Sequence, residues 1–320
     1  MQNMLKYLRV SVTDRCNLHC RYCETGVLQK LPPGRILAFE EICRFIRIAA
    51  GLGVETVRLT GGEPLVRSNV IDLFKMIKKI PGIHDVTFTT NGLLLKNFSR
   101  ELLEAGIRRF NVSIDTLDPV KFAGLAGSDS LKSVIEGVKE AGEMGFNPIK
   151  VNVVILKGIN DGEFCDFVEF GIANGYVVRF IELMNISGSP GFVEKHFMSA
   201  DEVKKIISAK YELSPCENLK AGIGPASYYS VNGGPAAIGF ITPVSRHFCD
   251  NCNRLRLTSD GGLKSCLLRP GEVNITELIR NEKNDDKLIE LVKKVLAGKE
   301  KACGKFIANG NFRGMTEIGG

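Results

Sequence analysis

The feature that most constrains this chain is a regular alternation of strand-like and helix-like segments as far as residue 183. The strand-like segments are short and apolar, and the segments between them carry apolar residues at helical spacing. We predict strands over residues 8–13, 54–60, 85–90, 108–115, 149–156 and 177–183, and helices over 39–52, 70–80, 99–105, 131–144, 163–173 and 200–208. This order is typical of a parallel α/β sheet covered by helices.

Polar and apolar side chains alternate within the predicted strands. Arg9, Ser11 and Thr13 share one face of the first strand, and valines occupy the other face. The second and fourth strands repeat this parity with the polar residues Arg58, Thr60, Asn111, Ser113 and Asp115. A closed eight-stranded barrel fills its lumen with branched apolar side chains. We therefore predict an open, incomplete barrel around a charged ligand; an antiparallel sheet with one solvated face is the alternative.

Three cysteines, Cys16, Cys20 and Cys23, lie in one short segment directly after the first predicted strand. This spacing can direct three thiolates to a common point, and thiolates are the usual ligands of iron–sulfur clusters. A four-iron cluster with three protein ligands leaves one iron open to a small molecule, as a catalytic zinc site leaves one position open. A zinc site is the alternative, and it would need a fourth ligand such as His19.

A second set of three cysteines is Cys249, Cys252 and Cys266. The pair Gly261-Gly262 can form a hairpin turn that returns Cys266 toward the other two. We predict a second four-iron cluster with an open iron, and the alternative is a structural zinc with His247 as its fourth ligand. The strand expected over 253–257 carries Arg254 and Arg256 on one face, and paired guanidinium groups bind phosphate oxygens.

The formal charge of +6 is modest for a chain of 320 residues. It suits an anionic substrate better than duplex nucleic acid, which requires a dense basic stripe. No segment approaches the ~20 continuous apolar residues that cross a bilayer, and the N-terminus has no charged lead into an apolar run. We expect a cytoplasmic protein that binds neither membrane nor nucleic acid, whose ten cysteines are metal ligands and thiols rather than disulfides.

The regular alternation ends after residue 185. A cluster of Gly, Ser and Pro over residues 187–191 interrupts the chain, and short strands with glycine-rich turns follow from residue 211. We therefore predict a barrel region over residues 1–210 and a C-terminal region over 211–320.

The first cysteine loop and the Gly61-Gly62-Glu63-Pro64 turn resemble the signature of radical S-adenosylmethionine (SAM) enzymes. Nearly the whole chain resembles one family among them, the GTP 3′,8-cyclases of molybdenum cofactor biosynthesis. The matching segments are residues 8–17, 58–65, 89–92, 111–115, 151–154, 157–160, 179–182, 249–266 and 319–320. The resemblance implies an incomplete (β/α)6 TIM-like radical SAM barrel whose open side is closed by a C-terminal α+β region with the second cluster.

The resemblance also implies the chemistry. SAM on the first cluster is cleaved to a 5′-deoxyadenosyl radical, which takes the ribose 3′ hydrogen of GTP. The resulting carbon radical attacks C8 of guanine, which ligates the second cluster, and the product is (8S)-3′,8-cyclo-7,8-dihydro-GTP. Two 4Fe-4S clusters and SAM are the implied cofactors. The implied partners are GTP, a reductant such as flavodoxin or ferredoxin, and cyclic pyranopterin monophosphate synthase downstream, with the chain as a monomer or homodimer.

Individual residues match functional positions of the family. The SAM-binding positions are Tyr22, Gly62, Glu63, Ser113 and Met184. The GTP-binding positions are Arg9, Arg58, Thr89, Lys157, Arg254, Leu255 and Arg256. The positions that match catalytic ones in the family are Arg254, Arg256, Gly319 and Gly320. The two glycines are included because the C-terminal end of these proteins reaches into the active site.

Two details do not fit simply. Glu24-Thr25-Gly26 departs from the Met-Pro that usually follows the third cysteine in the family. By strand parity, Arg179 and Met184 fall on opposite faces, so that one of them needs a bulge or a loop to reach the cavity. The alternatives to this function are a peptide-modifying radical SAM enzyme with an auxiliary cluster, and a non-catalytic zinc or iron–sulfur protein that binds RNA.

Overall fold

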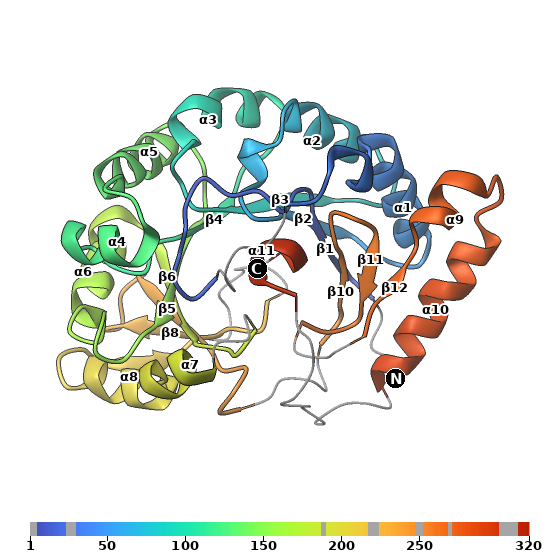
Figure 1. Ribbon diagram of the computed structural model, residues 1–320. Coiled ribbons are helices and arrows are strands. Elements are labelled where there is room, and N and C mark those ends of the chain that lie inside the picture. Colours follow the sequence, from blue (N-terminus) through green and yellow to red (C-terminus); the bar gives the residue numbers. More distant parts are fainter. Residues whose placement is uncertain are drawn as a thin grey trace.

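Six parallel strands form the centre of the computed structural model, which describes residues 5–23, 30–186, 190–216, 224–246, 252–267, 271–300 and 313–319. They are β1 (Tyr7–Ser11), β2 (Thr56–Thr60), β3 (Asp85–Thr90), β4 (Phe110–Ser113), β5 (Ile149–Ile155) and β6 (Val177–Glu182), each paired with the next. Figure 1 shows them curved into a partial barrel with helices along the outer side. The predicted parallel order is confirmed.

Helices connect these strands across the outer face, and two more helices follow β6. The connecting helices are η1 (Pro33–Arg35), α1 (Phe39–Gly51), η2 (Pro64–Val66), α2 (Val70–Lys78), α3 (Leu95–Glu104), α4 (Pro119–Ala126), α5 (Leu131–Glu143) and α6 (Phe164–Asn174), and those after β6 are α7 (Pro190–His196) and α8 (Ala200–Ser208). None of the helices in the described part of the chain has the length and apolar character of a membrane span.

Helix α4 was not expected from the sequence, and α3 begins four residues earlier than predicted. The start signal of α4 is present, because Asp118 accepts hydrogen bonds from the backbone N–H groups of Val120 and Lys121 and Pro119 occupies the first helical position. The helix has only eight residues, too few for a clear helical periodicity. Its C-terminal end is important below because it contacts the first cysteine loop.

The C-terminal region adds strands to both edges of the barrel sheet. At one edge β9 (Ala237–Ile241) pairs in parallel with β6 and is followed by β8 (Ser227–Val231) and β7 (Leu213–Pro215). At the other edge β10 (Arg254–Leu257) pairs in parallel with β1 and is followed by β11 (Gly262–Lys264) and β12 (Val273–Asn274). Helices α9 (Thr276–Asn281), α10 (Asp286–Glu300) and α11 (Met315–Ile318) complete the fold.

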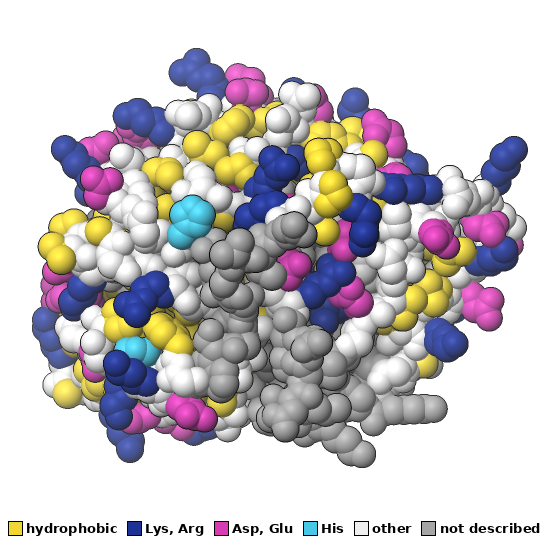
Figure 2. All heavy atoms as spheres, viewed as in Figure 1, with side chains coloured by type: hydrophobic (Ala, Val, Ile, Leu, Met, Phe, Trp, Pro, Cys, Tyr) yellow, Lys and Arg dark blue, Asp and Glu magenta, His cyan; other side chains and the backbone are white. Residues whose placement is uncertain are grey.

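The result is one sheet of twelve strands in the order β12-β11-β10-β1-β2-β3-β4-β5-β6-β9-β8-β7. The division of the chain near residue 210 stays a prediction. Figure 2 shows basic and acidic side chains interspersed over one face of the molecule rather than gathered in a stripe of one sign.

The two faces of the sheet differ as the strand parity predicts. Val10, Val57, Leu59 and Val112 are fully buried in the hydrophobic core. The intervening polar residues of the same strands point away from the helices, toward the concave side of the sheet. The open barrel with a polar inner face is confirmed, and it positions the site described next.

Candidate active site

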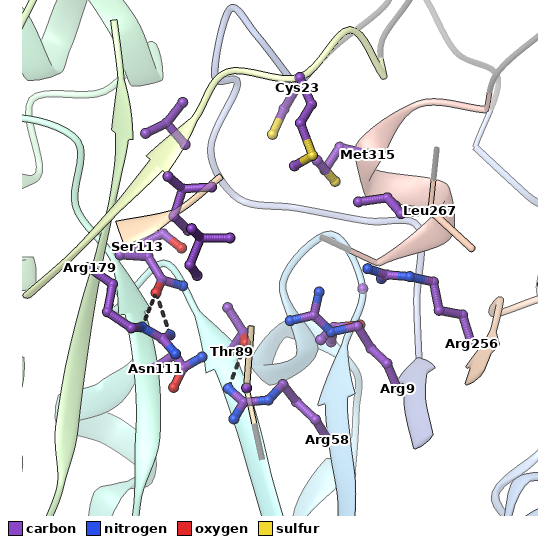
Figure 3. A pocket seen from close by; sticks show the side chains of 18 of the residues that line it. Arg9, Cys23, Arg58, Thr89, Asn111, Ser113, Arg179, Arg256, Leu267 and Met315 are labelled. Carbon is purple, nitrogen blue, oxygen red and sulfur yellow. Dashed lines mark hydrogen bonds between the residues drawn. The ribbon is translucent and has the colours of Figure 1, made fainter. Parts of the chain in front are cut away.

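A cavity of about 310 Å³ lies on the concave face of the sheet. Its walls come from the first cysteine loop, from inward-facing residues of the barrel strands and from the C-terminal region (Figure 3). This volume is within the range of small-molecule sites. Of the described residues that line it, none is an Asp or a Glu.

Three arginines form a row across one part of the cavity wall. The sheet register places Arg9 directly beside Arg256 on β10 and beside Arg58 on β2, and Figure 3 shows the three side chains in sequence. The Nε of Arg9 is buried without a hydrogen-bond partner. Burial, together with the charges of Arg58, Arg254 and Arg179, lowers the pKa of Arg9 to about 10. Such a row of cations is suited to a polyanionic ligand.

More polar side chains line the neighbouring part of the wall. The Nε of Arg179 donates to Oδ1 of Asn152 at 3.1 Å. Lys150 is only 2% exposed, and its burial and the charges of Arg179, Arg109 and Arg58 lower its pKa to about 6. A neighbouring acceptor, Oδ1 of Asn111, is buried without a hydrogen-bond partner.

The first cysteine loop is held at several points. The backbone N–H groups of His19 and Arg21 donate to the carbonyls of Ala126 (2.9 Å) and Leu125 (3.0 Å). These carbonyls belong to the last turn of α4, where carbonyls have no partner within the helix. The hydroxyl of Tyr22 donates to Oδ2 of Asp115 at 2.5 Å.

The three cysteines of this loop line the cavity, and none of them forms a disulfide. The amide of Asn91 donates to Sγ of Cys16 at 3.6 Å. Within the described residues, no three His, Cys, Asp or Glu side chains are gathered as ligands of a single metal ion. A four-iron cluster makes a different demand, because it takes three thiolates on three different irons. The three thiolates of this loop are a donor set that such a cluster can use.

The glycine turn after β2 packs closely against the start of this loop. A Cβ atom at Gly62 would lie 2.3 Å from the carbonyl oxygen of Arg15, and one at Gly61 would lie 2.5 Å from that of Thr13. Only glycine permits this approach. Both glycines line the cavity beside the cysteines.

Glu63 is fully buried and does not line the cavity. Its carboxylate accepts from the N–H groups of Leu65 (3.1 Å) and Asn91 (2.7 Å) and from the hydroxyl of Thr90 (2.9 Å). Burial raises its pKa to about 7. The carboxylate thus links the segments that follow β2 and β3. It is not accessible to a ligand in the cavity.

The other predicted SAM-binding residues, Tyr22, Gly62, Ser113 and Met184, line the cavity together. Arg179 and Met184 both line the cavity, although strand alternation predicted them on opposite faces. The reason is that the strand ends between them. Arg179 lies within β6, whereas Met184 lies two residues past its last residue, Glu182, where strand alternation no longer applies.

Of the predicted GTP-binding residues, five line the cavity: Arg9, Arg58, Thr89, Arg254 and Arg256. Leu255 is fully buried in the core, on the opposite face of β10. Lys157 is exposed outside the cavity, and its backbone pairs with His196. Lys150 lines the cavity instead. The signal for it was present, because Lys150, Asn152 and Val154 share one face of β5.

The C-terminal region supplies the remaining wall. Cys252 and Cys266 line the cavity with Met315 and Thr316. The carbonyl of Gly319 accepts a hydrogen bond from Arg256. Cys249, His247, Gly320 and residues 24–26 lie outside the described residues.

Known protein families and relatives match nearly the whole length of the chain. Residues 10–171 match the Radical SAM superfamily, and residues 176–304 match Molybdenum Cofactor Synthesis C. The chain is 44% identical to GTP 3′,8-cyclase of Syntrophomonas wolfei over 99% of this chain and 98% of that protein. It is 40% identical to GTP 3′,8-cyclase of Thermodesulfovibrio yellowstonii, with the same coverage.

Solved structures show the same fold at low identity. The crystal structure of Streptococcus suis SuiB bound to precursor peptide SuiA has a TM-score of 0.66 and 17% identity, over 93% of this chain and 67% of that chain. SuiB bound to S-adenosylmethionine has a TM-score of 0.62 and 18% identity, over 89% and 67%. At this identity the likeness concerns the fold alone.

Proposed function

Because the chain belongs to the GTP 3′,8-cyclase family of radical SAM enzymes, we propose that it converts GTP to (8S)-3′,8-cyclo-7,8-dihydro-GTP in the first step of molybdenum cofactor biosynthesis. One observation carries the proposal. Cysteines of both sets line a single cavity together with arginines and a buried lysine, and no described carboxylate lines it. A triphosphate would offset this concentration of positive charge, and the adjoining cysteines would hold the clusters that the reaction needs.

At one side of the cavity, Cys16, Cys20 and Cys23 would hold a 4Fe-4S cluster, and Tyr22, Gly62, Ser113 and Met184 would bind SAM. Bound together, the cluster and SAM supply the 5′-deoxyadenosyl radical that removes a hydrogen atom from the substrate. The chain's own part is to orient these groups. The Gly61-Gly62 turn lets the backbone pack directly against the start of the loop, and the buried Glu63 supports the turn through hydrogen bonds from Leu65 and Asn91.

Arg9, Arg58, Arg254 and Arg256 would bind the triphosphate, with Thr89 beside Arg58. Thr89 accepts a hydrogen bond from Nη1 of Arg58 at 3.2 Å, which aims the guanidinium into the cavity. We assign to Lys150, rather than Lys157, the lysine contact with the nucleotide, because Lys150 is the one that lines the cavity. Leu255 would act only by placing Arg254 and Arg256 on the inner face of β10.

Cys249, Cys252 and Cys266 would hold a second 4Fe-4S cluster, which would supply the binding position for the guanine base. Residues 1–210 would then serve as the radical-generating region, and residues 211–320 as the region that carries the second cluster and completes the substrate site. The remaining proposals are a flavodoxin or ferredoxin as the electron donor, cyclic pyranopterin monophosphate synthase as the enzyme that takes the product, and a cytoplasmic location.

The test is anaerobic reconstitution followed by a count of iron and sulfide and an assay with SAM, a reductant and GTP. We expect roughly eight irons, four for each cluster, and GTP-dependent formation of 5′-deoxyadenosine and the cyclised nucleotide. The variant Cys266→Ala should lose about half of the iron and all of the cyclised product. SAM cleavage without a nucleotide product would refute GTP as the substrate and favour a peptide-modifying enzyme, and zinc in place of iron would refute the radical mechanism.

A further inference from the structure

The described C-terminal tail, residues 313–319, begins at an ion-pair cluster. Arg313 makes two parallel contacts with Asp260, Nη1 to Oδ1 at 2.7 Å and Nη2 to Oδ2 at 2.9 Å. Its Nη2 also lies 2.6 Å from a carboxylate oxygen of Glu272. Asp260 lies in the turn between β10 and β11, and Glu272 directly precedes β12. Arg313 therefore joins the tail to the same β10–β11–β12 segment that carries Arg256.

The tail ends against the inner wall of the barrel. Arg256 donates to the carbonyl of Gly319 at 2.8 Å, and a Cβ atom at Gly319 would lie 2.2 Å from Oγ1 of Thr60. Between its two ends, Met315 and Thr316 line the cavity, and Ile318 is buried. Figure 1 shows α11 in the opening of the barrel, beside β10 and β11.

The tail is too short to hold this position by itself. Its helix, α11, has four residues, and an isolated helix of that length is not stable in water. The ion pair between Arg313 and Asp260 can hold the tail more strongly than its short helix can. The Asp260 side chain is 1% exposed, and a bidentate guanidinium–carboxylate pair combines charge with fixed geometry. Burial opposes ionisation of Asp260, but hydrogen bonds from Arg313 and Thr258 outweigh it and lower the pKa of this carboxyl.

We propose that Arg313 is a positioning residue that holds the C-terminal tail in the cavity through Asp260 and Glu272, so that the Gly319 carbonyl contacts Arg256. Arg313 itself does not line the cavity, so its effect on the reaction passes through the tail. The consequence for catalysis rests on the proposed function, because Arg256 is one of the groups assigned to the triphosphate. The position of the tail does not rest on it and can be measured separately.

The direct test is the rate at which carboxypeptidase releases the C-terminal residues from the reconstituted holoenzyme. In Arg313→Gln we expect release about tenfold faster than in the wild type or more, because removing one partner of a buried pair strongly weakens the structure that it holds. Arg313→Lys, which keeps the charge, should fall between the two. Equal rates for Arg313→Gln and the wild type would overturn the proposal.

A matched control is Arg280→Gln. Arg280 also pairs with a carboxylate, Glu41 at 2.7 Å, and joins the C-terminal region to the barrel, but it lies away from the tail. Its substitution should leave the release rate unchanged. Because the loss of Arg313 could hinder folding through the unpaired Asp260, Glu272→Gln serves as a second variant. It removes only the charge of one partly buried carboxylate and should raise the release rate by a smaller factor.

A second readout separates positioning from general stability. Arg313→Gln should lower kcat for the cyclised nucleotide while the iron content and the KM for SAM stay at wild-type values. Loss of iron together with kcat would mean a merely structural role and would overturn the proposal. If the wild type itself forms no cyclised nucleotide, the proposed function fails, but the carboxypeptidase rates still decide whether Arg313 holds the tail.

Discussion

The guanidinium of Arg256 donates from Nη1 to the backbone carbonyl of Gly319 at 2.8 Å, while its neighbour in the sheet register is Arg9. One side chain therefore belongs both to the row of cations and to the tail contact. Burial and the charges of Arg9 and Arg254 lower the pKa of Arg256 well below its usual range. The partial negative charge of the Gly319 carbonyl offsets some of this crowding before an anionic ligand is bound.

The first prediction concerns Gly319. Its φ is +73°, and a Cβ atom there would lie 2.2 Å from Oγ1 of Thr60 and 3.1 Å from Cβ of Ser11. In Gly319→Ala the end of the tail must therefore move away from Arg256. We expect formation of the cyclised nucleotide to fall about 100-fold, as a displacement of about 1 Å in an active site can cause, with the iron content unchanged.

The matched control for this change is Gly158→Ala. Gly158 has the same φ of +73°, but nothing lies within 4 Å of a Cβ atom placed there. This variant carries the backbone strain without the steric clash, and it should retain activity. Equal loss of activity in both variants would mean that strain, and not the contact between the tail and Arg256, explains the effect of Gly319→Ala.

The barrel half of the site could be predicted from the sequence because strand parity is a local property. Arg9 and Arg58 alternate with buried valine and leucine, and that pattern alone places them on the inner face. Lys150 obeys the same rule within β5. The family resemblance instead indicates Lys157, two positions past the strand, as the lysine that binds GTP. The structure places Lys150 in the cavity wall and Lys157 outside it, and the proposal that Lys150 contacts the nucleotide follows from that placement.

The C-terminal half could not be predicted in this way because its position depends on contacts far apart in the chain. The pairing of β10 with β1 brings Arg256 beside Arg9, and no local pattern specifies which strand edge β10 joins. The same holds for Arg313, whose partner Asp260 is 53 residues away. The sequence showed the glycine pair at positions 319 and 320, but it gave no indication that Arg313 holds the tail through Asp260.

The second prediction concerns Arg254. In Arg254→Ala we expect the affinity for GTP to weaken by about 1.5 to 3 kcal/mol, the typical contribution of a hydrogen bond to a charged group. Affinity for SAM should stay the same, and equilibrium binding without reductant measures both. Arg246→Ala is the control, because Arg246 is exposed and pairs with Asp201 outside the cavity. Wild-type GTP affinity in Arg254→Ala would remove Arg254 from the triphosphate site.

The third prediction concerns the pH dependence of GTP binding. The pKa of Lys150 in the free protein is lowered to about 6, first by burial and then by the charges of Arg179, Arg109 and Arg58. Lys150 is therefore mostly neutral at pH 7.5, and a bound triphosphate should restore its charge. Binding of GTP should take up protons at this pH, and affinity should be highest below about pH 6 and fall as the pH rises.

Calorimetry in two buffers with different ionisation enthalpies measures this proton uptake. Lys150→Met should take up fewer protons, by at most about one per GTP. Lys157→Met, which removes an exposed lysine outside the cavity, should match the wild type, and the difference between the two variants excludes the protons that GTP itself exchanges. If Lys157→Met takes up fewer protons and Lys150→Met matches the wild type, the lysine that contacts the nucleotide is Lys157 and not Lys150.

The last prediction concerns the hydrogen bond between Tyr22 and Asp115. Tyr22 directly precedes Cys23 and lines the cavity, and its hydroxyl is 2.5 Å from Oδ2 of Asp115, whose Oδ1 accepts from the N–H of Val154 at 2.8 Å. Asp115 thus ties the cysteine loop to the ends of β4 and β5. We expect Tyr22→Phe to weaken SAM binding by about 0.5 to 1.5 kcal/mol, the net contribution of one hydrogen bond.

A double-mutant cycle identifies the route of this effect. If Asp115 acts through Tyr22, the variant with both Tyr22→Phe and Asp115→Asn should bind SAM no more weakly than the worse of the two single variants. Fully additive losses would show that the two side chains act independently. Tyr176→Phe is the control, because it removes a phenol hydroxyl that contacts the carbonyl of Val138 at 3.4 Å, away from the cavity. A loss of SAM affinity there would mean that general destabilisation, and not the orientation of the loop, governs the result.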